Sequence, residues 1–131
     1  MREESPEQIA RNFFSAMEQM DFDRGLQFVA DDVEYINSPD TRVTGHQGVR
    51  AVLEPFFEPI AENEFIIERV ASAGEIVFVQ RLDRHRIAQS WFELPVAAVL
   101  EIKSGRIVYL REYFDLGTVQ SAMTALLEGA P

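Results

Sequence analysis

Hydrophobic residues recur at helical spacing over the first part of the chain. Residues 5–8, Ser-Pro-Glu-Gln, have the form of a helix start, with a capping serine, proline at the first helical position and glutamine at the third. Ile9, Phe13, Met17 and Met20 then follow near one-turn intervals. This spacing predicts an amphipathic helix whose apolar stripe packs against a core.

The next part of the chain indicates two more helices with a short strand between them. A short helix is expected over residues 23–29, and a strand over residues 33–37 that stops at Ser38-Pro39. A third helix is expected to begin after Gly45 and to end near residue 57.

The second half of the chain is rich in β-branched and aromatic residues, which favour strands. The predicted strands cover residues 65–72, 76–85, 91–102 and 106–114, with a closing helix over 118–127. Turn-forming residues at 74–75 and 103–105 indicate hairpins. Helices first and antiparallel strands afterwards predict one α+β domain over residues 1–131, with the helices packed on a curved, mostly antiparallel sheet that walls a pocket.

Composition narrows the possible chemistry. The 131 residues include no cysteine, which excludes disulfides and thiol nucleophiles. The two histidines are widely separated, so no metal site is expected. The seven glycines are scattered at turns instead of forming a phosphate-binding loop, so no nucleotide cofactor is expected either.

Charge and hydropathy narrow the possible partners. The formal charge of −10 argues against nucleic acid and against a strongly anionic substrate. No run approaches the ~20 apolar residues that cross a bilayer, and the acidic N-terminus does not resemble a targeting peptide. We therefore expect a cytoplasmic protein that does not enter a membrane and that binds a neutral, rather apolar small molecule.

Residues two apart in a strand point to the same face, about 7 Å from one another. Arg81 and Asp83 therefore form a polar patch at the end of the apolar register of Val77 and Val79. In an arbitrary strand such a pair is most often an exposed ion pair. His85 shares this face and could reach the mouth of a pocket, although the arginines on either side of it favour a solvated turn.

Tyr35 and Asn37 form a second pair on one strand face. A phenol and an amide side by side can orient a water or a carbonyl group. Asn before Ser-Pro is also ordinary turn chemistry, so this pair alone does not indicate a site.

The last predicted strand carries a single carboxylate on an apolar face. Val108, Leu110, Glu112 and Phe114 alternate to that face, while Asp115 falls on the other. A lone carboxylate among apolar side chains is costly unless it is paired or functional. Glu112 is therefore the pocket candidate, and Asp115 is predicted to end the strand or to cap a helix.

Taken in order, three motifs resemble the limonene-1,2-epoxide hydrolase family. This family is a branch of the cone-shaped α+β domains that include ketosteroid isomerase, scytalone dehydratase and the SnoaL-like polyketide cyclases. The motifs are Tyr35-x-Asn37-x-Pro39, Arg81-x-Asp83 and Arg-Glu-Tyr-Phe-Asp at residues 111–115. The resemblance implies a mixed sheet that forms a cone around an internal pocket, and a homodimer built through the outer sheet face.

The resemblance also implies one-step hydrolysis of a small apolar epoxide by water, without a cofactor. Glu112 would take a proton from the water, which Tyr35 and Asn37 help to hold. Asp83 would protonate the epoxide oxygen, and Arg81 would bridge the two carboxylates while stabilising mainly Glu112. The substrate pocket is then expected to include His85, Leu94, Val96, Leu110 and Phe114.

The last strand departs from the family pattern, Trp-Arg-Asp-Tyr-Phe-Asp, at two positions. Leu110 stands in place of the tryptophan, and Glu112 in place of the aspartate that serves as base. His85 also stands where the family tends to be apolar. Two alternatives stay open. A polyketide cyclase or ketosteroid-isomerase-like enzyme would move a proton beside a carbonyl, and a non-catalytic module would only bind a small ligand.

Overall fold

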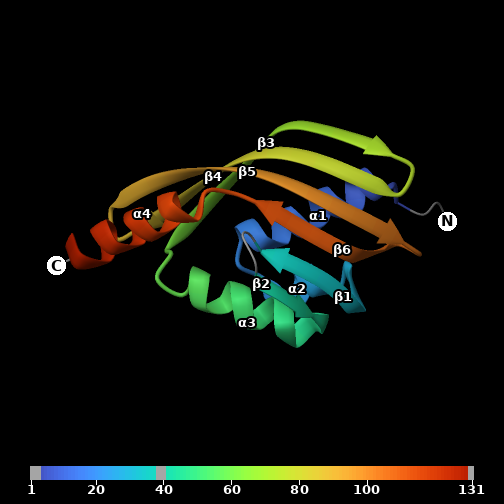
Figure 1. Ribbon diagram of the computed structural model, residues 1–131, viewed down its shortest axis with the longest axis horizontal. Coiled ribbons are helices and arrows are strands. Elements are labelled where there is room, and N and C mark those ends of the chain that lie inside the picture. The colour runs from blue at the N-terminus through green and yellow to red at the C-terminus, as the bar shows by residue number, and fades with distance from the viewer. Residues whose placement is uncertain (1–3, 38–40, 130–131) are drawn as a thin grey trace.

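The computed structural model describes residues 4–37 and 41–129, in which helices pack against one curved sheet (Figure 1). In chain order the elements are α1 (Pro6–Glu18), α2 (Phe22–Leu26), β1 (Val29–Asn37), β2 (Thr41–Thr44), α3 (Gly45–Phe57), β3 (Glu62–Ala73), β4 (Ile76–Ile87), β5 (Ser90–Lys103), β6 (Arg106–Tyr113) and α4 (Leu116–Gly129).

Helix α1 begins and packs as its sequence predicts. The Ser5 side chain accepts a hydrogen bond from the backbone N–H of Gln8 at 3.1 Å, which satisfies one of the free donors at the helix start. The apolar stripe is buried, with Phe13 and Met17 in the core. The chain then turns sharply at Met20, which has a φ of 56°.

The six strands form one mixed sheet in the order β2-β1-β6-β5-β4-β3. Neighbouring strands are antiparallel except β1 and β6, which run parallel. Hairpins join the four long strands, β3 to β6. In the last hairpin Ser104 and Gly105 have φ angles of 52° and 77°, as a two-residue turn of type I′ requires.

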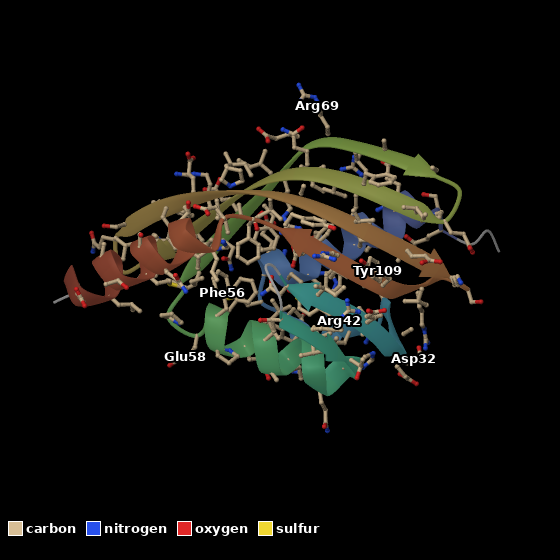
Figure 2. All side chains as sticks on the ribbon, viewed as in Figure 1. Asp32, Arg42, Phe56, Glu58, Arg69 and Tyr109 are labelled. Carbon is tan, nitrogen blue, oxygen red and sulfur yellow. The ribbon has the colours of Figure 1, made fainter. Side chains whose placement is uncertain are left out.

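Helices α1, α2 and α3 cover one side of the sheet, and α4 lies at one end (Figure 1). Helix α1 contacts β3 to β6, and α3 contacts β1 and β2. Phe56 of α3 lies on the covered, inner side, whereas Arg69 of β3 projects from the outer side (Figure 2). Within residues 4–37 and 41–129, no helix is long and apolar enough to cross a membrane.

The predicted helices and strands all occur, although several of their bounds differ from the prediction. The second helix ends at Leu26 instead of Val29, because Val29 already begins β1. The short strand β2 was not predicted. Its four residues pair with β1 at the sheet edge and carry no apolar alternation that would distinguish them from a loop.

Strand β6 carries a bulge that its sequence pattern does not indicate. Tyr109 pairs with Glu101 and Ile107 with Ile102, so Val108 has no partner on β5. Ile107 is therefore buried inside the sheet, against the predicted register. The bulge precedes Leu110, and from that residue onward the predicted alternation holds.

Candidate active site

A cavity of about 200 Å³ lies between the inner face of the sheet and helices α1, α3 and α4. Its wall is largely apolar. Six phenylalanines line it: Phe13, Phe14, Phe56, Phe57, Phe65 and Phe114. A concave apolar wall with a few convergent polar groups is the usual form of a small-molecule site.

Arg81 and Asp83 supply polar groups from the inner face of β4. Each is only 4% exposed, so the alternative of an exposed ion pair is wrong. The guanidinium donates two hydrogen bonds to the carboxylate, from Nε to Oδ1 at 2.6 Å and from Nη2 to Oδ2 at 2.9 Å. It also lies over the ring of Phe14, with 4.4 Å from Cζ to the ring centroid, which holds its plane against α1.

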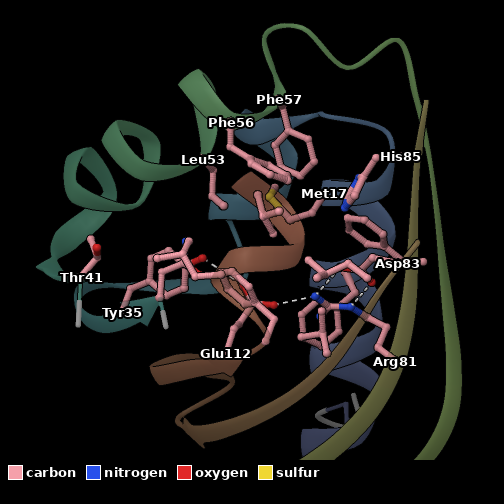
Figure 3. A pocket seen from close by; sticks show the side chains of 18 of the residues that line it. Met17, Tyr35, Thr41, Leu53, Phe56, Phe57, Arg81, Asp83, His85 and Glu112 are labelled. Atoms are coloured by element: carbon pink, nitrogen blue, oxygen red, sulfur yellow. Dashed lines mark hydrogen bonds and ion pairs between the residues drawn. The ribbon is translucent and has the colours of Figure 1, made fainter. Parts of the chain in front are cut away.

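Glu112 of β6 completes a buried triad with Arg81 and Asp83 (Figure 3). Its Oε2 accepts a hydrogen bond from Nη2 of Arg81 at 2.6 Å. Its Oε1 accepts one from the hydroxyl of Tyr35 at 2.9 Å. Both carboxylate oxygens are therefore held, so the side chain has a defined position in the wall of the cavity.

Strand β5 lies between the two halves of the triad. Arg81 pairs with Val96 of β5, and Glu112 pairs with Ala98. Because β4 and β6 lie two strand spacings apart, their side chains must span about 10 Å to meet. The long side chains of Arg81 and Glu112 together span this distance and pass over the small side chain of Ala98. The extra methylene gives glutamate a longer reach than aspartate would have.

Strand β1 brings the remaining polar pair to the same wall. Its parallel register with β6 sets Tyr35 beside Leu110 and Asn37 beside Glu112. Both residues of the pair line the cavity. The structure thus gathers Tyr35, Asn37, Arg81, Asp83 and Glu112 at one end of the pocket, while their catalytic roles stay predictions.

The net charge of the triad favours a proton on one of its two carboxylates. With both carboxylates ionised, the triad would carry a net negative charge in a buried site. Burial raises the pKa of Asp83, and the opposing charge of Arg81 does not cancel this increase. Burial therefore shifts Asp83 toward its protonated form.

The arginine and the tyrosine keep their protons. Burial alone would lower the pKa of Arg81, but the charges of Glu112 and Asp83 raise it above its usual value. Burial and the neighbouring Glu112 carboxylate raise the pKa of the Tyr35 phenol, so this hydroxyl remains a donor. Two of the three bonds that Arg81 makes in the triad go to Asp83 and one goes to Glu112, and the expectation that Arg81 mainly stabilises Glu112 stays a prediction.

Asp115 is exposed and lies outside the cavity, as its predicted strand face requires. Its Oδ2 accepts hydrogen bonds from the backbone N–H of Thr118 at 3.1 Å and from the Thr118 hydroxyl at 2.6 Å. These bonds lower the pKa of Asp115. This arrangement is that of a capping residue at the start of α4, which confirms the structural role predicted from the sequence.

Comparison with known proteins identifies the family of this chain. The family model of the limonene-1,2-epoxide hydrolase catalytic domain matches residues 4–125. The chain belongs to the limonene-1,2-epoxide hydrolase family. A curated relative, epoxide hydrolase EphG of Mycobacterium tuberculosis, is 29% identical over 104 residues, which cover 79% of this chain and 69% of that protein.

Solved structures confirm the cone-shaped fold. An LEH-like epoxide hydrolase from M. tuberculosis superposes with a TM-score of 0.76 at 25% identity, covering 95% of this chain and 96% of that chain. A SnoaL-like polyketide cyclase from Shewanella putrefaciens superposes with a TM-score of 0.79 at 17% identity, covering 91% and 85% of the two chains. The second likeness concerns the fold alone.

Four of the five predicted substrate-pocket residues line the cavity of this family member: His85, Leu94, Val96 and Phe114. Leu110 does not line it. It is buried in the main core beside Leu100, on the side of Glu112 that faces away from Phe114. The triad forms the floor of the cavity, and Leu110 lies beyond that floor.

The sequence predicted that the helices pack against a core, but it did not predict that they form part of the pocket wall. Helices α1, α3 and α4 contribute the lining residues Phe13, Phe14, Met17, Leu53, Phe56, Phe57, Leu116 and Val119. Their apolar spacing indicates that they face inward, but the same spacing serves a filled core. The sequence carries no signal that distinguishes the two uses.

His85 is buried, at 1% exposure, so the alternative of a solvated turn is wrong. Strand β4 continues to Ile87, and alternation sends Arg84 and Arg86 to the opposite face, where they pair with glutamates. The imidazole Nδ1 lies 2.6 Å from Oδ1 of Asn63. The ring packs among Phe56, Phe57, Phe65 and Phe92.

His85 is expected to make the protein less stable as the pH falls. Burial and the charge of Arg81 lower the pKa of His85 to about 4, against 6.5 for an unperturbed imidazole. Between these values the unfolded chain binds a proton that the folded protein does not. The resulting loss in the free energy of unfolding is absent well above pH 6.5 and complete near pH 4, where it amounts to about 3 kcal/mol.

Urea unfolding of wild type and His85→Leu between pH 4.5 and 7 checks this expectation. The raised pKa of Asp83 acts with the opposite sign, so the difference between the two proteins is the informative quantity. The free energy of unfolding should decline more steeply toward low pH in the wild type. Parallel curves would contradict the assignment.

Proposed function

We propose that the protein is a cofactor-independent epoxide hydrolase that adds water in one step to a neutral, largely apolar epoxide and releases a vicinal diol. The observation that carries this proposal is the buried triad at the floor of a phenylalanine-lined cavity, in which Arg81 bridges Asp83 and Glu112. Epoxide opening needs an acid and a base that act together, and the triad supplies one of each.

Asp83 is the proposed general acid. Its raised pKa favours the protonated form that an acid needs at the start of the reaction. As the C–O bond breaks, the proton passes to the epoxide oxygen, which becomes the first hydroxyl of the diol. Arg81, bound to both Asp83 oxygens, then stabilises the aspartate left behind.

Glu112 is the proposed general base. It takes one proton from a water whose oxygen forms the new C–O bond, and so gives the second hydroxyl. Tyr35 donates to Oε1 of Glu112 and thereby orients the carboxylate, and Asn37 lines the cavity on the adjacent strand. After release of the diol, the proton on Glu112 must return to Asp83 to restore the starting state.

The homodimer expected from the fold is part of the same proposal. Ile66 and Phe78 are 42% and 47% exposed. Each follows an inward-facing residue on its strand, Phe65 or Val77, so both fall on the outer face of the sheet, opposite the cavity. Exposed apolar side chains on one sheet face support its use as an interface.

The decisive experiment incubates purified protein with a panel of neutral epoxides and measures diol formation in the presence of a metal chelator. We expect diol to form at an unchanged rate under chelation. A single turnover in ¹⁸O-water, with enzyme in excess, should label the diol, because the attacking oxygen comes from water.

Two results would contradict this mechanism. An unlabelled diol in the first turnover would mean that a carboxylate attacks the carbon. Absence of diol from every epoxide, together with hydrogen exchange beside a carbonyl in a ketone substrate, would favour the alternative of a cyclase or isomerase.

A further inference from the structure

One ring nitrogen of His85 is buried without a hydrogen-bond partner among the described residues. This atom is Nε2, and the whole side chain is 1% exposed. Its neighbours are phenylalanine rings, of which Phe92 and Phe56 lie 5.1 and 5.2 Å away between ring centroids. Buried polar atoms are rarely left unpaired in native proteins, so this nitrogen requires a reason.

The hydrogen bonds of Asn63 determine which form of the ring is present. The Asn63 amide Nδ2 donates to the backbone carbonyl of Glu18 at 3.3 Å, so its Oδ1 faces His85. An oxygen only accepts, and Nδ1 of His85 must therefore carry the hydrogen of the 2.6 Å bond. In the neutral ring Nε2 then carries a lone pair and can only accept a hydrogen bond.

His85 lines the same cavity as the triad (Figure 3). It lies two residues after Asp83 on the inner face of β4, which separates the two side chains by about 7 Å along the strand. A small molecule with its epoxide oxygen at Asp83 would therefore extend toward the imidazole. The surrounding wall is apolar, so a hydrogen bond to Nε2 would be the main polar contact at this end of the pocket.

We infer that Nε2 of His85 accepts a hydrogen bond from a hydroxyl group of the substrate, so that the substrate class is epoxides with a hydroxyl on the part of the molecule remote from the epoxide ring. This inference rests on the proposed function and deepens it. A hydroxyl fits better than an ammonium, because the phenylalanines around His85 supply no carboxylate to balance a buried positive charge.

Two nearly isosteric epoxides test the inference. One is cyclohexene oxide with a hydroxymethyl group at ring carbon 4, and the other carries an ethyl group there. In the wild type we expect kcat/KM to be about 10- to 100-fold higher for the hydroxymethyl compound, the scale of one buried hydrogen bond whose loss leaves an unpaired acceptor. His85→Leu should reduce this ratio to within a few-fold of one.

Two further variants separate hydrogen bonding from packing. His85→Gln keeps a side-chain acceptor and should retain part of the preference. Phe92→Leu removes a ring that packs on His85, and Phe92 is not among the residues that line the cavity, so the ratio should stay unchanged because the Nε2 acceptor is kept. A wild-type ratio near one, or a high ratio that survives in His85→Leu, would overturn the inference.

A binding experiment keeps this outcome separate from failure of the proposed function. The corresponding alkenes, with hydroxymethyl or ethyl groups, cannot be hydrolysed. In protein with ¹⁵N-labelled histidine, the only other histidine, His46, can be assigned with a His46→Gln variant. The Nε2 resonance of His85 should shift with the hydroxymethyl alkene and not with the ethyl one. Equal shifts would overturn the inference even if epoxides are hydrolysed, and a selective shift would support it even if they are not.

Discussion

Asp83→Asn is expected to reduce epoxide turnover by about 10²- to 10⁴-fold, the usual contribution of a general acid. The amide has the same size as the carboxylic acid but no acidic proton to give to the epoxide oxygen. The fold should persist, because the amide oxygen can still accept a hydrogen bond from Arg81. Steady-state kinetics with the best epoxide of the panel measures the loss.

A matched variant controls for the substitution itself. Asp32→Asn makes the same chemical change at an exposed position of β1, which projects away from the cavity (Figure 2). Its rate should stay within a few-fold of wild type. Circular dichroism and thermal unfolding should show both variants folded. If Asp83→Asn turned over epoxide at a rate near wild type, Asp83 would not be the acid.

Glu112→Gln is expected to reduce the rate by about 100-fold or more, because the amide cannot take the proton of the attacking water. The glutamine can still accept a hydrogen bond from Arg81 and contact Tyr35, so stability should change little. Asp115→Asn is the matched control three positions away. That residue caps α4 outside the cavity, and its loss should cost at most about 1 kcal/mol of stability, with a rate within a few-fold of wild type.

Substitutions of the two carboxylates, Glu112 in β6 and Asp115 at the start of α4, are therefore expected to give opposite results. Kinetics and urea unfolding of both variants give the comparison directly. If Asp115→Asn lost activity while Glu112→Gln retained it, the assignment of the base would have to move to Asp115. Equal losses in both variants would point to a shared structural effect, which the unfolding curves would reveal.

Much of the site could be predicted because strand alternation is a local property. Arg81, Asp83 and His85 share a face in any regular strand, and a lone carboxylate between Leu110 and Phe114 indicates a buried, paired group. For the same reason, the helix at Ser5 follows from its cap and its apolar spacing. These features depend on neighbours within a few residues, so they hold wherever the element lies in the fold.

Other features depend on contacts between distant parts of the chain. The bulge at Val108 comes from the fit of β6 to β5, and no residue within β6 signals it. His85 is flanked by two arginines that favour solvent, yet Asn63 from β3 and four phenylalanines bury it. A histidine in such a setting is indistinguishable from an exposed one until its neighbours across the sheet are known.

By itself, the sequence determined the order of the elements, the apolar faces of the helices and the polar residues that alternate toward one side of each strand. Backbone periodicity and side-chain hydropathy are sufficient for these features. Only the tertiary structure decided that Arg81 meets Glu112 across β5, that Leu110 is buried in the main core, and that one histidine nitrogen has no partner among residues 4–37 and 41–129. These depend on distances between strands and on the space left between helices and sheet, which packing alone establishes.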